Sequence, residues 1–346
     1  MTAFSPQPNY TLEIHNNDQT IKLTVKSCLQ KLYLYKSKAY KRNETATIEV
    51  DTLEFSRLIL DGKNIRFEEL PCKDQELSFE ILHRKLKESI QIETFNQDTL
   101  KTLNLYGNVN GFNNAAGLLA DKNHFPGIDI VKFVENISII QKRSTFENIS
   151  VLEVYEKAID VFRDYYHYEV IQGVDRKKME KIPEAAFREA IANALIHRVW
   201  DVDSQIRVSM FEDRIEIVSP GGLPSGITEE EYLFGKLSVL RNRNLANVFY
   251  RLGFVEICGT GITRIKQLYA ESLIKPDFEV SQNAIKIVLP IFEKNADLTE
   301  DEFVIYKLLS KMMLKPISEV APYVPFGKSK TTKLLKEMCQ CSCAVK

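Results

Sequence analysis

Three polar residues recur at one-turn spacing in the segment that follows Pro183: Glu189, Asn193 and His197. In an α-helix, residues four apart lie on the same face, so this spacing predicts one stripe of a carboxylate, an amide and an imidazole. Pro183 fits the start of such a helix, because the first turn needs no N–H donor there. Groups of these three types on one face could act on a common ligand, although such a stripe is more often a solvated helix surface.

Two glycine motifs follow the stripe along the chain. Ser219-Pro-Gly-Gly-Leu-Pro224 comes after a predicted strand and indicates a turn, and Gly259-Thr-Gly-Ile-Thr-Arg264 opens a predicted helix. Backbone N–H groups at a helix N-terminus favour an anion, so the second motif is a candidate anion site. Each motif alone is weak, since a Gly-Gly pair is usually only a turn. Their order along the chain is the more informative feature.

Hydrophobic periodicity places these motifs in an alternation of strands and helices. Residues 10–50 alternate like two or three strands, and strands at 205–211 and 214–218 are joined by Glu212-Asp213, which predicts a hairpin. Ile128 to Val134 is expected to form a buried strand. Helices are expected over 52–60, within 76–106, over 150–168 and from Pro183 onward. The pattern predicts a mixed α/β (α+β) fold.

Length and composition describe an ordinary soluble protein with two or three domains. The 346 residues are 44% hydrophobic and 27% charged, with a formal net charge of −1. No signal peptide or run of about 18 apolar residues is visible, so we expect a cytoplasmic protein with no membrane partner. The six cysteines are too scattered to frame a disulfide-stapled fold, and reduced thiols are expected.

The near-neutral net charge hides two basic clusters. Seven basic residues and no acidic ones lie between Lys22 and Arg42, interleaved with tyrosines in a strand-like pattern. A second cluster lies near the C-terminus. Such faces could bind phosphates of DNA or RNA, or could simply be solvated strand and helix faces. The candidate nucleic-acid contacts are Lys36, Lys38, Lys41, Arg42, Lys330, Thr331, Lys333 and Lys336.

Residues 183–265 resemble a divergent GHKL ATPase domain of the histidine-kinase and gyrase type. The resemblance rests on Phe187-Arg-Glu-Ala-Ile-Ala-Asn-Ala-Leu-Ile-His-Arg198, Asp213-Arg-Ile-Glu-Ile-Val-Ser-Pro-Gly-Gly-Leu-Pro224 and Cys258-Gly-Thr-Gly-Ile-Thr-Arg-Ile265, which occur in family order. In bacterial regulators often labelled RecG-like, this domain follows a Schlafen-like, Alba-type DNA-binding domain. The resemblance therefore implies a GHKL-type α/β sandwich.

The resemblance also implies roles for individual residues. The helix glutamate of the family polarises the attacking water and the asparagine one turn later coordinates Mg²⁺, so Glu189 and Asn193 take these roles here. ATP and Mg²⁺ are the implied cofactors, and 232–252 would form a lid. Ser219-Pro220 stands where classical members have the carboxylate that reads adenine. The implied nucleotide-binding residues are Asn193, His197, Gly221, Gly222, Gly259, Thr260 and Gly261.

Four regions are expected along the chain: a partial Alba/Schlafen-like domain (1–62), a connecting α/β region (63–150), the GHKL-like domain (151–293) and a truncated winged-helix-like module (294–346). The module is expected from a capped helix at 298–311, a second helix at 317–323 and a third beginning near Ser329. Phe326-Gly-Lys-Ser329 lacks the first glycine of a phosphate loop, because residue 322 is proline, so no helicase motor is expected.

The expected function is a DNA-binding transcriptional regulator in which bound ATP modulates the affinity for nucleic acid. Two alternatives stay open: a slow Mg²⁺-dependent ATPase effector switched by a partner, and a catalytically silent, truncated remnant. A homodimer is compatible with each of them.

Overall fold

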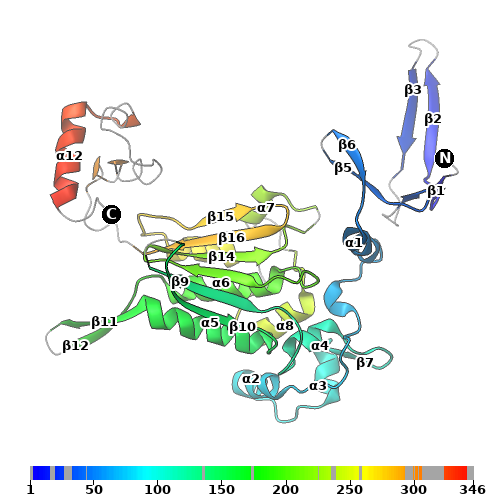
Figure 1. The fold of residues 1–346 in the computed structure, drawn as a ribbon, viewed down its shortest axis with the longest axis horizontal. Coiled ribbons are helices and arrows are strands. Elements are labelled where there is room, and N and C mark those ends of the chain that lie inside the picture. The colour runs from blue at the N-terminus through cyan, green and yellow to red at the C-terminus, as the bar shows by residue number, and fades with distance from the viewer. Residues whose placement is uncertain are drawn as a thin grey trace.

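A six-stranded mixed sheet with helices packed on one face dominates the structure, a computed structural model of the chain (Figure 1). The architecture confirms the expected mixed α/β class. The structure describes residues 3–15, 20–26, 33–43, 45–134, 137–172, 175–224, 226–234, 239–256, 259–292, 299, 301–302, 304–305 and 323–340.

The strand order in this sheet is β10-β9-β13-β14-β16-β15. Neighbouring strands are antiparallel except β9 and β13, which are parallel. The strands are β9 (Ile128–Phe133), β10 (Ile140–Phe146), β13 (Ile206–Met210), β14 (Arg214–Pro220), β15 (Asp277–Val280) and β16 (Ala284–Pro290). Because β9 and β10 precede residue 150, the expected regions 63–150 and 151–293 share one sheet and one hydrophobic core.

The helical layer covers one face of the sheet. Helices α5 (Val151–Tyr166) and α6 (Glu184–His197) pack on it, and α8 (Arg243–Arg251) and α9 (Gly261–Leu268) pack against α6. Residues of β14 and β16 alternate between buried and partly exposed, which is the pattern of a sheet with one face in the core. Ile215, Ile217 and Ile287 are among the buried side chains, and burial of each contributes about 1.5–3 kcal/mol.

A smaller helical unit precedes β9 and completes the core. Its aromatic and leucine side chains, including Leu82, Leu86 and Leu118, belong to the same hydrophobic cluster as the sheet residues. Its elements are the 3₁₀ helix η1 (Phe67–Glu69), α2 (Glu80–Ile90), α3 (Gln97–Thr102), β7 (Tyr106–Gly107), β8 (Gly111–Phe112) and α4 (Asn114–Leu119).

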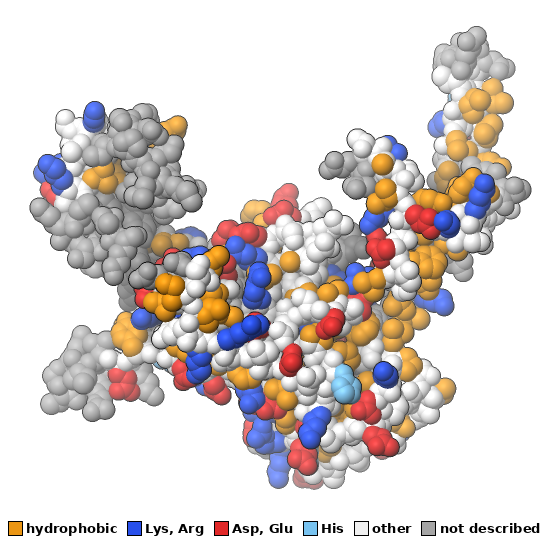
Figure 2. Space-filling model, viewed as in Figure 1, with side chains coloured by type: hydrophobic (Ala, Val, Ile, Leu, Met, Phe, Trp, Pro, Cys, Tyr) orange, Lys and Arg blue, Asp and Glu red, His pale blue; other side chains and the backbone are white. Residues whose placement is uncertain are grey.

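The N-terminal residues form two-stranded pairs separate from the six-stranded sheet. Figure 1 shows them projecting from the main body, and Figure 2 shows hydrophobic side chains on their surface. The expected strands and the helix at 52–60 are present, whereas the described residues do not join the strands into one sheet. The elements are β1 (Phe4–Ser5), β2 (Tyr10–His15), β3 (Thr20–Val25), β4 (Leu34–Tyr35), β5 (Tyr40–Asn43), β6 (Ala46–Glu49) and α1 (Thr52–Gly62).

Four further elements are a two-stranded hairpin and two helices. The hairpin of β11 (His167–Gln172) and β12 (Asp175–Glu180) links α5 to α6, and α7 (Glu229–Leu233) lies between β14 and α8. Near the C-terminus, α12 (Lys328–Gln340) contains the third helix of the expected winged-helix-like module. The expected helices at 298–311 and 317–323 lie largely outside the described residues. In the described part of the chain, no helix is long and apolar enough to cross a membrane.

Candidate functional site

Helix α6 carries the Glu189, Asn193 and His197 stripe, as its spacing predicts. The helix begins after Pro183, and its apolar side holds Phe187, which is fully buried in the core. The polar stripe is not a solvated surface either, because Glu189 is only 7% exposed. Burial of a carboxylate is unfavourable unless partners satisfy it, so the contacts of Glu189 show which groups stabilise it in the core.

Glu189 has two partners, one on each oxygen. The Asn193 amide nitrogen donates to Oε1 over 3.4 Å, and the Arg264 guanidinium of α9 lies 3.6 Å from Oε2. Burial raises the pKa of Glu189, while Arg264 and the bond from Asn193 oppose that rise. With its nitrogen turned to Glu189, Asn193 keeps its amide oxygen for another ligand, such as a cation.

The second glycine motif closes directly on this pair. Gly261 begins α9, and a Cβ added there would lie 2.5 Å from Glu189 Oε1 and 2.6 Å from Asn193 Nδ2. Glycine is therefore required at 261 for close approach. The structure thus brings Glu189, Asn193 and the N-terminus of α9 together, although 72 residues separate Glu189 from Gly261 in the sequence.

A cavity of about 90 Å³ opens beside the pair, between α6, β14, β16 and α9. Its walls are mostly apolar and include Ile217, Ile285 and Ile287. The predicted residues that line it are Asn193, His197, Gly221, Gly222, Gly259 and Gly261. Thr260 precedes α9 and is exposed beside them. Pockets for whole ligands usually hold about 300–1,000 Å³, so this cavity suits one ring system rather than an entire nucleotide.

The Gly-Gly turn forms one end of the cavity. Gly221 has a positive φ of 105°, and a Cβ there would lie 2.4 Å from a methyl group of Val199. A Cβ at Gly222 would lie 2.3 Å from the Gln282 carbonyl oxygen. Both glycines are therefore required by packing, so the motif is a tight turn and also a wall of the cavity.

His197 and Ser219 are polar groups in the apolar part of the cavity. Burial and the nearby Arg241 lower the pKa of His197 to about 4, so its imidazole is neutral at physiological pH. The Ser219 hydroxyl donates to the Ala194 carbonyl oxygen over 3.0 Å. Ser219 therefore presents an acceptor lone pair, and not a proton, to a ligand in the cavity.

One face of residues 241–252 packs into the core, although Tyr250 and Arg251 are exposed, so this part of the segment expected as a lid (232–252) is held in place. The buried Asn242 donates to the carbonyl oxygens of Ile196 and Arg198 over 2.6 and 2.9 Å. Arg241 donates to the Gly222 carbonyl oxygen over 2.8 Å. These bonds hold the end of α6 and the Gly-Gly turn in place. They also explain why the polar side chains of Arg241 and Asn242 point inward.

The N-terminal basic residues are partly neutralised by acidic neighbours from other strands and from α1. Lys38 pairs with Glu49 over 2.7 Å, and Lys41 pairs with Glu54. Arg42 contacts the Thr47 hydroxyl over 3.4 Å, and Lys36 lies 5.5 Å from the centre of the Tyr35 ring. In Figure 2, positive and negative side chains are interspersed on the visible face.

The C-terminal candidates lie on α12. Lys330 pairs with Asp301, and Lys333 lies 3.7 Å from Glu337. Thr331 is fully buried and its hydroxyl donates to the Gly327 carbonyl oxygen over 3.2 Å. Because its side chain is buried, Thr331 does not fit the nucleic-acid contact predicted for it. Lys330, Lys333 and Lys336 remain as candidates.

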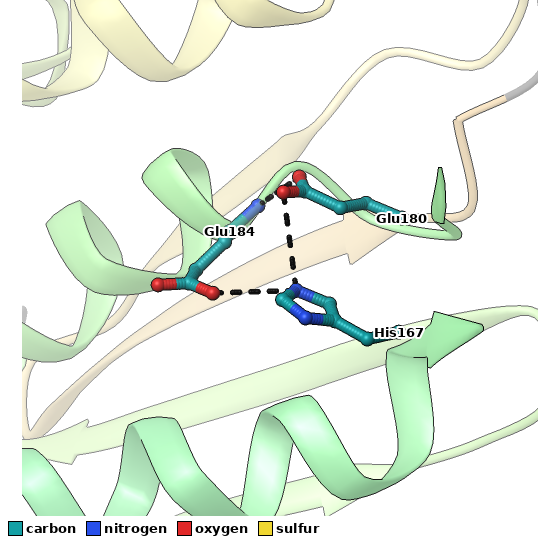
Figure 3. A group of neighbouring side chains, drawn as sticks. All are labelled: His167, Glu180 and Glu184. Carbon is teal, nitrogen blue, oxygen red and sulfur yellow. Dashed lines mark hydrogen bonds and ion pairs between the residues drawn. The ribbon is translucent and has the colours of Figure 1, made fainter. Parts of the chain in front are cut away.

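A second polar cluster lies where the β11–β12 hairpin meets α6 (Figure 3). Nε2 of His167 is 3.3 Å from Glu184 and 3.9 Å from Glu180, and the three side chains could hold a metal ion by residue type. However, Glu184 accepts two bonds from Arg163, over 2.8 and 2.6 Å. Arg163 also lowers the pKa of Glu184. Because this guanidinium would repel a cation, the cluster is best explained as an anchor of the hairpin.

Several residues that hold the site together were not predicted from the sequence. Arg198 is fully buried and donates to four backbone carbonyl oxygens, those of Pro126, Gly127, Val202 and Ser204. The β16 wall could have been found from the alternation of Ile285, Ile287 and Leu289, which has period two. No sequence pattern indicates the contacts of Arg198 with Pro126 and Gly127, or of Arg264 with Glu189, because each of these partners is more than 70 residues away along the chain.

Comparisons with known proteins show that part of this site is similar to a known family. Residues 203–289 match the family described as "Putative ATP-dependent DNA helicase recG C-terminal". The match spans β13 to β16 and includes α9, but it begins after α6. The crystal structure of the DIP2311 protein from Corynebacterium diphtheriae is similar, with 20% identity, a TM-score of 0.59, and coverage of 98% of this chain and 73% of that one. That likeness shows the fold alone.

No curated protein matches the chain in sequence. The matched segment supplies the Gly-Gly turn, the apolar strands and the Gly-x-Gly helix of the cavity. This half of the site therefore resembles the ATPase-like domain of the recG-like family.

Proposed function

We propose that the cavity binds the base of ATP and that the phosphates, with Mg²⁺, lie toward Glu189, Asn193 and the start of α9. One observation carries the proposal: α6 and α9 hold these groups together beside an apolar, ring-sized cavity. The family match over 203–289 supports an ATPase-like site. A nucleotide bound in this way places its charge at a helix N-terminus, where backbone N–H groups and the helix dipole favour phosphate.

The residues fit Mg²⁺, because the Asn193 amide oxygen and the Glu189 carboxylate are hard oxygen donors. Bound Mg²⁺ would neutralise phosphate charge. Asn193 would hold the ion, and Glu189 would orient a water molecule and accept its proton. The raised pKa of Glu189 favours slow hydrolysis as a second candidate function, because a more basic carboxylate is a better proton acceptor.

Titration calorimetry with ATP and Mg²⁺ tests the proposal. Asn193→Ala is expected to weaken binding by about tenfold or more, which corresponds to the loss of roughly 1.4 kcal/mol. Asn108→Ala, at an exposed turn, is the matched control and should bind like the wild type. Glu189→Gln should retain ATP, while any phosphate release disappears. Equal heats from the wild type and Asn193→Ala, or no heat from either, would overturn the proposal.

We further propose that ATP binding modulates the affinity of the protein for DNA, so that it acts as a nucleotide-dependent regulator. Two segments that project from the main body in Figure 1 support this, because the N-terminal segment contains Lys36 and Arg42, and α12 contains Lys333 and Lys336. The ion pair of Lys333 with Glu337 and the net charge of −1 predict that few phosphates are contacted.

A further inference from the structure

Arg264 connects the start of α9 to the buried glutamate. It lies three residues after Gly261, so its side chain is in the first turn of α9 and 35% exposed. Its guanidinium contacts two carboxylates that differ in their exposure to solvent. Glu189, at 3.6 Å, is nearly fully buried, whereas Glu256, the closer partner, is 60% exposed.

The contact with Arg264 restrains Glu189 in the structure described. Glu189 Oε1 accepts from Asn193 and Oε2 faces Arg264, so both oxygens have a partner. A guanidinium stabilises the ionised carboxylate and makes it a weaker proton acceptor.

We propose that Arg264 binds the terminal phosphates of the nucleotide and, in doing so, leaves Glu189. This inference rests on the proposed ATP site. A guanidinium binds phosphate through two parallel hydrogen bonds, and Arg264 stands at the helix end that favours the same anion. Arg264 thus makes the affinity depend on the phosphates and frees Glu189 only when they are present.

Glu256 competes with the phosphates for Arg264. Their ion pair is exposed to solvent, and such pairs contribute little, so a nucleotide can break it. Removal of the Glu256 charge should therefore leave Arg264 more available. Loss of the Glu256 charge should thus strengthen ATP binding, whereas loss of Arg264 should weaken it. A merely structural role of Arg264 would not produce these opposite effects.

The test compares binding of ATP and of adenosine, both with Mg²⁺, by titration calorimetry. Arg264→Gln is expected to weaken ATP binding about tenfold or more while adenosine affinity stays within about twofold. Glu256→Gln should tighten ATP severalfold and leave adenosine unchanged. Arg251→Gln, an exposed arginine on α8, is the control and should match the wild type for both ligands. Thermal unfolding checks that each variant is folded.

The outcomes separate this inference from the proposed function. If the wild type binds neither ATP nor adenosine, the proposed function fails and the inference fails with it. If the wild type binds ATP and Arg264→Gln binds it equally well, only the inference is overturned. If Arg264→Gln does not fold, Glu256→Gln decides: tighter ATP binding supports the inference, and unchanged or weaker binding contradicts it.

Discussion

At the scale of single residues, the site depends on a glycine, which has no Cβ, at position 261. The absence of this atom lets α9 approach Glu189 and Asn193 within van der Waals contact. The Gly-x-Gly motif predicted Gly261 as part of an anion site, whereas its packing against the α6 stripe is visible only in three dimensions. A glycine that lines a site can therefore be required for space as much as for its backbone N–H.

Gly261→Ala should separate ligand binding from stability. The added methyl group would push the ends of the Glu189 and Asn193 side chains, which can rotate away, so the free energy of unfolding should fall by no more than about 1–3 kcal/mol, the usual cost of overpacking. Affinity for ATP with Mg²⁺ should fall about tenfold or more because the two side chains lose their positions. Calorimetry and thermal unfolding measure the two effects. Gly107→Ala, which meets no atom within 4 Å, is the control, and unchanged ATP affinity in Gly261→Ala would contradict the role given to position 261.

At the scale of elements, local sequence patterns were enough to predict a helix or strand whose own residues mark its start and its buried face. The spacing of Glu189, Asn193 and His197 predicted α6, and Pro183 predicted its start, both of which are confirmed. The pairing of β9 with β13 could not be predicted, because this parallel contact joins strands more than 70 residues apart. Likewise, α8 does not fit the lid expected over 232–252, since the fold buries Asn242 and Asn244.

Glu68 illustrates a link between elements that makes stability depend on pH. This fully buried carboxylate accepts from the backbone N–H groups of Asn244 and Leu245, over 2.9 and 3.2 Å, at the start of α8. Burial raises the pKa of Glu68 to about 7. Because the folded pKa is above the unfolded value near 4.5, the contribution of Glu68 is fully present below pH 4.5 and is lost as the pH rises through 7.

Glu68→Gln should remove this loss. Between pH 5 and pH 8, the wild type should lose about 2 kcal/mol of unfolding free energy relative to the variant, since His197 and the other groups titrate in both proteins. Chemical denaturation at several pH values measures the difference, whatever the absolute stability of the variant. Glu76→Gln, at an exposed position before α2, is the control and should follow the wild-type profile. Parallel profiles for the wild type and Glu68→Gln would show that Glu68 does not titrate in this range.

At the scale of the whole molecule, charge and apolar surface are distributed unevenly. One face of the β2–β3 hairpin carries Leu12, Ile14, Ile21 and Leu23, each about half exposed or more, while Glu13 and Lys22 pair on the other face. Four of the candidate nucleic-acid residues that the sequence sets apart have acidic partners in space: Lys38, Lys41, Lys330 and Lys333. Part of the charge that makes up the net value of −1 is therefore balanced locally, within ion pairs such as Lys38–Glu49 and Lys41–Glu54.

This local balance sets a quantitative expectation for DNA binding. Each phosphate contact steepens the fall of affinity with salt by roughly 0.9 in a log–log plot, so a protein with few free cations should show a shallow slope. Replacing Lys36 and Arg42 with alanine should lower that slope by about 1 to 2 and weaken binding to all sequences alike. Fluorescence anisotropy with labelled duplex DNA at increasing salt measures it, and Lys157→Ala on α5 is the control. A slope that the double variant leaves unchanged would place the DNA contacts elsewhere, whereas a shift of the whole plot on adding ATP would connect them to the nucleotide site.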